Sequence, residues 1–142
     1  RNMERLQRKW QTARQLVPKA EIVGRGGPVG VLYIGTTSLP IPEALAKLAV
    51  KGIHLDTCRV RAFPFGDEVE AFVAEHDLIF VVEQNRDAQM RTLLINELQT
   101  NPAKLISILY FAGLSISADF IDAQISAYYE EHKLARLTEV KS

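Results

Sequence analysis

The chain has 142 residues, which suits one domain and leaves little room for two. Its 17 basic and 17 acidic residues balance, which argues against nucleic acid or an anionic membrane as a partner, because both favour a basic excess. The single cysteine, Cys58, excludes an internal disulfide, and no apolar run approaches the ~20 residues of a membrane span, so we expect a soluble cytoplasmic protein.

The opening residues predict a helix. Apolar side chains recur at spacings of three and four to form one stripe, made of Met3, Leu6, Trp10, Ala13 and Val17. The basic residues of this segment lie mostly off the stripe, which favours a solvated face over a phosphate site. Pro18 ends the helix, so we expect a leading helix or linker at residues 1–18 and a domain at residues 19–142. Arg1 is not an initiating residue, and we expect the chain to begin partway along a longer protein.

Four short apolar runs follow, and each precedes a helical pattern. The predicted strands occupy residues 29–34, 57–62, 78–82 and 105–110. The predicted helices occupy residues 42–51, a short stretch from residue 67, residues 87–98 and residues 118–132. This alternation predicts parallel strands with right-handed crossovers, and the fully apolar strands predict helices on both faces of the sheet. A short extra strand near residues 21–23 fits an edge of the sheet.

Two glycine-containing segments are candidates for a ligand-binding loop. In residues 24–30 (GRGGPVG) the glycines precede a strand instead of following one, and Pro28 removes a donor, so we predict no dinucleotide site there. Residues 24–28 are predicted to form a loop with mobile glycines. Residues 35–38 (GTTS) lie between the first parallel strand and its helix, where the hydroxyls of Thr36 and Thr37 could hold an anion. Turn formation and helix capping are the commoner roles of such residues.

The richest polar segment is residues 83–91 (EQNRDAQMR), which leaves the carboxyl end of the third parallel strand and enters a helix. Ligands of open α/β sheets gather at such ends. One alternative is a capped helix start, with Asn85 or Asp87 as the cap and the arginines solvated. Because capping needs fewer polar groups than this, we favour docking or binding. The predicted docking or anion-binding edge comprises Thr36, Thr37, Asn85, Arg86, Gln89 and Arg91.

No catalytic residue or metal ligand is predicted. The three histidines (His54, His76 and His132) lack the close spacing of a metal site and are better explained as surface or structural groups. Neither a Gly-x-Ser-x-Gly elbow nor a Walker loop is present. One cysteine cannot hold an iron–sulfur cluster, which usually takes four.

Several segments together resemble the alpha subunit of 2-oxoacid:ferredoxin oxidoreductases, in the 2-oxoglutarate branch. They are residues 2–10 (NMERLQRKW), 31–37 (VLYIGTT), 59–65 (RVRAFPF) and 80–91 (FVVEQNRDAQMR). The resemblance covers nearly the whole chain, and residues 131–142 match least.

The resemblance implies a three-layer α/β/α sandwich like the transketolase C-terminal domain, with a mostly parallel five-stranded sheet and one antiparallel edge strand. It also implies an enzyme that converts a 2-oxoacid and coenzyme A to acyl-CoA and CO2 and reduces ferredoxin. Thiamine diphosphate with Mg and iron–sulfur clusters serve that chemistry on other domains or on the beta subunit.

This chain lacks the Gly-Asp-Gly…Asn metal-diphosphate motif of the family and its cysteines. We therefore expect a non-catalytic structural or assembly domain that binds none of these cofactors. Its expected partners are the remaining domains of the alpha subunit and the beta subunit. Two alternatives stay open: a free-standing small-ligand or nucleotide-binding module, with a nucleotide at the edge of Thr36 and Asn85, and the equivalent domain of a lipoamide-linked 2-oxoacid dehydrogenase.

Overall fold

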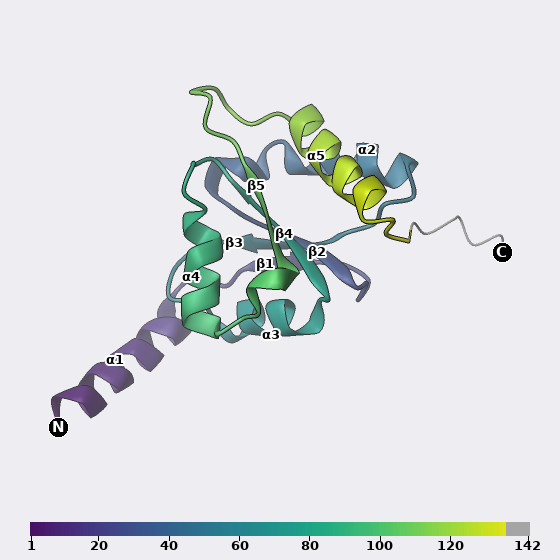
Figure 1. Cartoon of the computed structure of the whole chain (residues 1–142). Coiled ribbons are helices and arrows are strands. Elements are labelled where there is room, and N and C mark those ends of the chain that lie inside the picture. Colours follow the sequence, from purple (N-terminus) through teal and green to yellow (C-terminus); the bar gives the residue numbers. More distant parts are fainter. Residues whose placement is uncertain (136–142) are drawn as a thin grey trace.

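One mixed sheet organises the molecule (Figure 1). The computed structural model describes residues 1–135, and within them the sheet has five strands in the order β1-β3-β2-β4-β5. The strands are β1 (Glu21–Val23), β2 (Val29–Ile34), β3 (Asp56–Val60), β4 (Leu78–Glu83) and β5 (Leu105–Leu109). The β2, β3, β4 and β5 strands are parallel, and β1 runs antiparallel to β3 at one edge.

Helices cover both faces of the sheet (Figure 1). The helices are α1 (Asn2–Leu16), α2 (Ile41–Val50), α3 (Asp67–Glu75), α4 (Gln89–Leu98) and α5 (Ala118–Glu131), with the short 3-10 turns η1 (Gly35–Ser38) and η2 (Pro102–Lys104). Side chains of β2 alternate between the two faces, so Val31 and Tyr33 pack with α2 and α5, whereas Leu32 packs with α3 and α4. The predicted three-layer α/β/α fold, with its antiparallel edge strand, is confirmed.

The element boundaries differ from the predicted ones by at most two residues. The largest differences are at β3, which ends at Val60 instead of residue 62, and at α4, which begins at Gln89 instead of residue 87. In α4 the residue before the helix, Ala88, has a left-handed backbone with φ 51°, so the regular helix begins only after it.

The α1 helix projects away from the sheet and its covering helices (Figure 1). None of its residues is buried. Its last turns are attached to the domain by Arg14, which donates to the Phe65 carbonyl and pairs with Asp67 and Glu70 of α3. The division of the chain at residue 18 remains a prediction.

Candidate functional site

The sheet has a topological switch point between β2 and β4. These strands are neighbours, but β2 continues through α2 to β3 on one side, whereas β4 continues through α4 to β5 on the other. The connections therefore diverge at the carboxyl ends of β2 and β4, where open α/β sheets bind ligands. We call η1 together with residues 83–89 the switch-point edge. Gly35 starts η1 with φ 67°, a conformation that favours glycine.

Gln84 spans the switch-point edge. Its Nε2 donates to the hydroxyl oxygens of Thr36 and Thr37, each at 3.1 Å. Its Oε1 accepts from the backbone N–H of Ile116, which precedes α5, at 3.4 Å. One amide thus ties together the segments that follow β2, β4 and β5, across the place where a ligand would enter.

The carboxylate of Glu83 binds the backbone N–H groups at the start of α4. Its side chain is buried, with the residue 2% exposed. Its carboxylate accepts hydrogen bonds from the backbone N–H groups of Met90 and Arg91, in the first turn of the helix. These N–H groups and the helix dipole would otherwise favour a phosphate or another external anion. The internal carboxylate occupies that position.

The structure brings most of the predicted edge residues together. Asn85 donates from Nδ2 to Glu83 Oε1 at 3.0 Å, and its Oδ1 accepts from the backbone N–H of Gln89 at 3.4 Å. Asn85 therefore takes part in capping α4, as one alternative proposed. Arg86 has an exposed side chain (75%), and its Nε lies 3.3 Å from Asp87 Oδ1.

Arg91 points away from the switch-point edge. Its Nε donates to the Leu105 carbonyl at 2.9 Å, and a terminal nitrogen donates to the Pro102 carbonyl at 3.0 Å. The guanidinium is thus bonded to the backbone at the start of β5. The structure gives Arg91 an internal structural contact, separate from the predicted edge.

Glu83 and Gln84 were not predicted individually as site residues, although both lie in the polar segment of residues 83–91. A signal for Glu83 exists: a carboxylate ends a buried strand, and the residue just before the helix, Ala88, has no side chain that could cap it. Gln84 offers no comparable signal, because its partners, Thr36 and Thr37 on one side and Ile116 on the other, lie in two stretches of the chain far from it in sequence.

A second polar cluster was not predicted. The buried Asp56 carboxylate accepts from His76 Nε2 and from the backbone N–H groups of Arg25 and Gly27, each at 2.9 Å. The other ring nitrogen, His76 Nδ1, lies 2.7 Å from the Phe72 carbonyl. Gly24 makes room for the carboxylate, since a Cβ at Gly24 would lie 2.3 Å from Asp56 Cγ. The predicted 24–28 loop is present, and these bonds anchor it.

The Asp56 carboxyl is held in its charged form. Burial alone would raise its pKa, but the hydrogen bond from His76, the two backbone N–H donors and the His76 charge lower the pKa below its ordinary value of 3.8. All polar groups of this cluster find partners within the domain, which fits a structural role.

Groups that could carry redox or metal chemistry are few in the described residues. Cys58 is fully buried on β3, and burial, assisted by the charge of Glu68, raises the pKa of its thiol to about 12. No group of three or more His, Cys, Asp or Glu side chains in residues 1–135 is placed to hold a metal ion. No helix in the same range is both long and apolar enough to cross a membrane.

Comparisons with known proteins add a likeness at the level of the fold. No family model and no curated protein matches the sequence. Among solved structures, the chain is similar to 2-oxoglutarate:ferredoxin oxidoreductase from Magnetococcus marinus, solved with 2-oxoglutarate, coenzyme A and succinyl-CoA bound. The TM-score is 0.71 and the identity 21%, over 82% of this chain and 21% of that one.

A second similar structure is the alpha chain of a probable 2-oxoacid ferredoxin oxidoreductase from Thermoplasma acidophilum. Here the TM-score is 0.50 and the identity 22%, over 79% of this chain and 97% of that one. The chain therefore corresponds to about a fifth of the Magnetococcus chain and to nearly the whole of the Thermoplasma chain.

Proposed function

We propose that this chain is a structural and assembly domain of the alpha subunit of a 2-oxoacid:ferredoxin oxidoreductase. Two independent observations support the family. The sequence segments at residues 31–37, 59–65 and 80–91 resemble it, and both similar structures described above carry that name. The 2-oxoglutarate branch is the best-supported substrate class, because the similar Magnetococcus enzyme was solved with 2-oxoglutarate and coenzyme A bound.

The main observation in favour of a structural role is that side chains of the chain itself occupy the switch-point edge, where a ligand would bind. Glu83 takes the anion position at the start of α4, and Gln84 bridges the segments that surround it. A nucleotide-binding module would need those N–H groups for phosphate. The arrangement therefore favours an assembly domain over the free-standing nucleotide-binding alternative.

The described residues do not fit the redox and thiamine cofactors of the proposed enzyme. An iron–sulfur cluster needs several thiolates, and the chain has one buried cysteine whose pKa is raised to about 12. The Mg of thiamine diphosphate needs a cluster of oxygen ligands, and in residues 1–135 no three His, Cys, Asp or Glu side chains are placed to hold a metal ion. We assign these cofactors to other parts of the enzyme, with ferredoxin as the electron acceptor.

Arg86 is the residue of the switch-point edge that we assign to an external contact. Its side chain is 75% exposed, and its ion pair within residues 1–135 is with the neighbouring Asp87, which is 65% exposed, at 3.3 Å. A guanidinium offers several donors in a planar fork that suits a carboxylate or a phosphate. The proposed partner is another domain of the alpha subunit, the beta subunit or the phosphates of coenzyme A.

The test is to purify the intact gene product with its co-purifying subunits and to measure acceptor reduction with 2-oxoglutarate and coenzyme A. We expect activity that depends on thiamine diphosphate in the intact complex and none from residues 1–142 alone. The Arg86→Ala variant of the complex should weaken subunit association or raise the KM for coenzyme A. Arg61→Ala, another exposed arginine outside the edge, is the matched control.

Two results would contradict the proposal. An intact protein without 2-oxoacid-dependent reduction would remove the family assignment. Calorimetric binding of ATP or NAD to residues 1–142, abolished by Thr37→Val, would support the nucleotide-binding alternative instead.

A further inference from the structure

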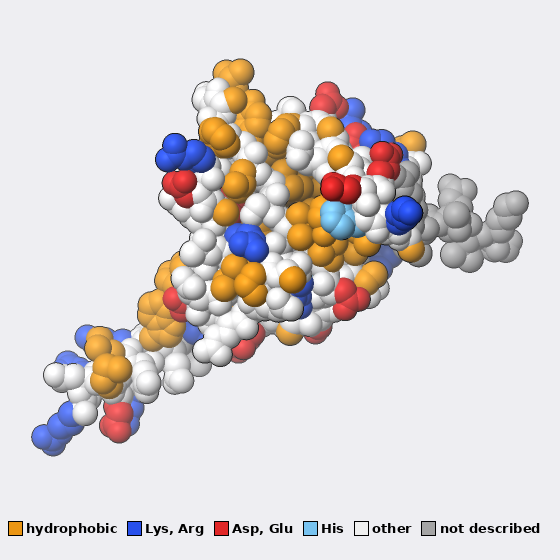
Figure 2. All heavy atoms as spheres, viewed as in Figure 1, with side chains coloured by type: hydrophobic (Ala, Val, Ile, Leu, Met, Phe, Trp, Pro, Cys, Tyr) orange, Lys and Arg blue, Asp and Glu red, His pale blue; other side chains and the backbone are white. Residues whose placement is uncertain are grey.

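The α1 helix leaves an apolar stripe uncovered. Trp10 is 42% exposed and contacts Phe63 with ring centroids 5.3 Å apart, whereas Leu6 and Met3 further along the same stripe are 60% and 70% exposed. The stripe begins on the domain and continues past its edge, as the apolar side chains along α1 show in Figure 2. A 15-residue helix is marginal in water without packing, so this face calls for a partner surface.

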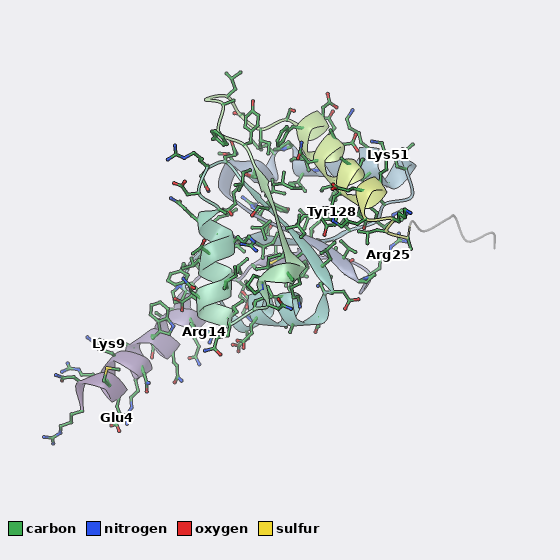
Figure 3. The ribbon with its side chains drawn as sticks, in the orientation of Figure 1. Glu4, Lys9, Arg14, Arg25, Lys51 and Tyr128 are labelled. Atoms are coloured by element: carbon green, nitrogen blue, oxygen red, sulfur yellow. The ribbon has the colours of Figure 1, made fainter. Side chains whose placement is uncertain are left out.

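The net positive charge of α1 indicates which charge the partner surface should carry. Residues 1–16 contain five of the 17 basic residues and only one of the 17 acidic ones, Glu4. The chain as a whole is neutral, so the remainder carries four more acidic than basic residues. Lys9 and Glu4 extend from the projecting part of the helix, and Arg14 lies at its base (Figure 3). The surface that covers the stripe should therefore be acidic.

The domain itself carries a hollow of this kind, between β1 and α3. Its lining combines apolar side chains, among them Ile22, Ala71 and Phe72, with the carboxylates of Glu68 and Glu75 and the Asp56–His76 pair. Ile22 is 44% exposed, and no lysine or arginine lines the hollow. The hollow thus combines an apolar surface with acidic side chains around it.

The α3 helix already accepts a cation from α1 of its own chain. Arg14 pairs with Asp67 at 3.2 Å and with Glu70 at 3.0 Å, both in the first half of α3. Glu75, at the other end of α3, lies outside these ion pairs and lines the hollow. The projecting half of α1 leads away from its own domain, so the cations near its N-terminus are available to another molecule (Figure 3).

We propose that α1 docks in the β1–α3 hollow of a second copy of this chain, and that the two copies exchange their helices reciprocally. Met3 and Leu6 fill the hollow, and Lys9 lies beside Glu75 of the partner copy. A side-by-side pair of α1 helices would cover the same stripe but would bring two strongly basic helices together. The hollow supplies the opposite charge, and a reciprocal exchange forms a closed dimer. This inference does not depend on the proposed function.

The experiment measures the dimer dissociation constant of the full 142-residue chain by sedimentation equilibrium. Leu6→Asp should weaken the dimer at least tenfold, because it places a carboxylate in an acidic, apolar hollow. Lys9→Glu should weaken it at least fivefold. Arg8→Glu is the matched control: it makes the same charge change one residue away, on the face of α1 opposite the stripe, and should change the constant less than twofold.

A charge exchange makes the test specific. Glu75→Lys alone should also weaken the dimer, and an equimolar mixture of the Lys9→Glu and Glu75→Lys chains should form a heterodimer tighter than either variant's homodimer. A chain that stays monomeric at millimolar concentration overturns the proposal, and so does equal weakening by Arg8→Glu and Lys9→Glu. A monomer that co-sediments with vesicles of phosphatidylcholine and phosphatidylglycerol through α1 overturns it in favour of a lipid surface.

Discussion

Burial should make the Cys58 thiol unreactive in the folded chain, a property that the sequence alone does not determine. Its side chain is fully buried on β3, and the pKa of the thiol is raised to about 12, so it is protonated at neutral pH. We expect Cys58→Ala to lower the free energy of unfolding by about 1–2 kcal/mol. The folded chain should not react with a thiol reagent until urea unfolds it. Rapid labelling of the native chain would indicate a reactive role.

Asp56 is expected to make stability depend on pH. Its pKa is lowered in the folded state, so its contribution is fully present above the ordinary value of 3.8 and is lost as the pH falls below it. Asp56→Asn should cost about 1–3 kcal/mol at pH 7, because a charged acceptor of three hydrogen bonds is replaced by a neutral amide. As the pH falls from about 4 to about 2, the free energy of unfolding of the Asp56→Asn variant should decrease less steeply than that of the wild type.

The control is Asp77→Asn, which makes the same change on an exposed residue next to His76. Urea titrations at several pH values should show a change below about 0.5 kcal/mol for this variant. If Asp56→Asn and the wild type lose stability in parallel on acidification, Asp56 does not carry the effect.

At the scale of the element, the start of α4 depends on a carboxylate six residues before it. Glu83→Gln keeps the shape but removes the charge that accepts from Met90 and Arg91, and should cost about 1–2 kcal/mol. Asp87→Asn changes an exposed carboxylate near the same helix end and should stay within about 0.5 kcal/mol. Chemical denaturation of both variants measures the difference, and equal losses would show that the capping role is wrong.

The two arginines of this segment should behave differently in the same assay. Arg91→Ala removes two hydrogen bonds to the carbonyls of Leu105 and Pro102 and should cost about 1–2 kcal/mol. Arg86→Ala removes only an exposed contact with Asp87 and should change the melting temperature little. A large loss of stability for Arg86→Ala would indicate an internal role and weaken its assignment to an external partner.

The elements themselves follow closely from the sequence, because buried strands and amphipathic helices impose distinct apolar patterns. The start of α4 was predicted less well. Its N-cap, Ala88, is not a capping residue, and the cap comes from Glu83 on the preceding strand. The bridge from Gln84 to Thr36, Thr37 and Ile116 depends on which strands are neighbours, which local pattern does not encode.

At the scale of the whole molecule, α1 should enlarge the particle. A compact monomer of this length has a radius of gyration of roughly 14–15 Å. Because α1 projects from the domain, small-angle X-ray scattering of the dilute, monomeric chain should give a larger value. Removal of residues 1–16 should return it to about 14 Å. A full-length monomer that already scatters as a compact sphere would mean that α1 folds back onto its own domain.

The fold could be predicted as a whole, because the sequence alternates strands and helices and resembles a family with this architecture. The behaviour of α1 could not. Its apolar stripe predicts a covered face, yet the stripe meets the domain from Trp10 onward, whereas Met3 and Leu6 stay exposed. The periodicity of apolar residues shows which face of a helix is apolar, but it does not show which surface covers that face.

Arg91 also has a consequence for how the sheet ends. The outer strand β5 is an edge, and unpaired backbone groups on an edge can recruit a strand from another molecule and start aggregation. The Arg91 fork already occupies the carbonyl at the first residue of β5, and the opposite edge, β1, is only three residues long. Fraying of the first turns of α4 would release this carbonyl, so we expect a local loosening of α4 to leave the start of the β5 edge open to pairing with a strand of another molecule.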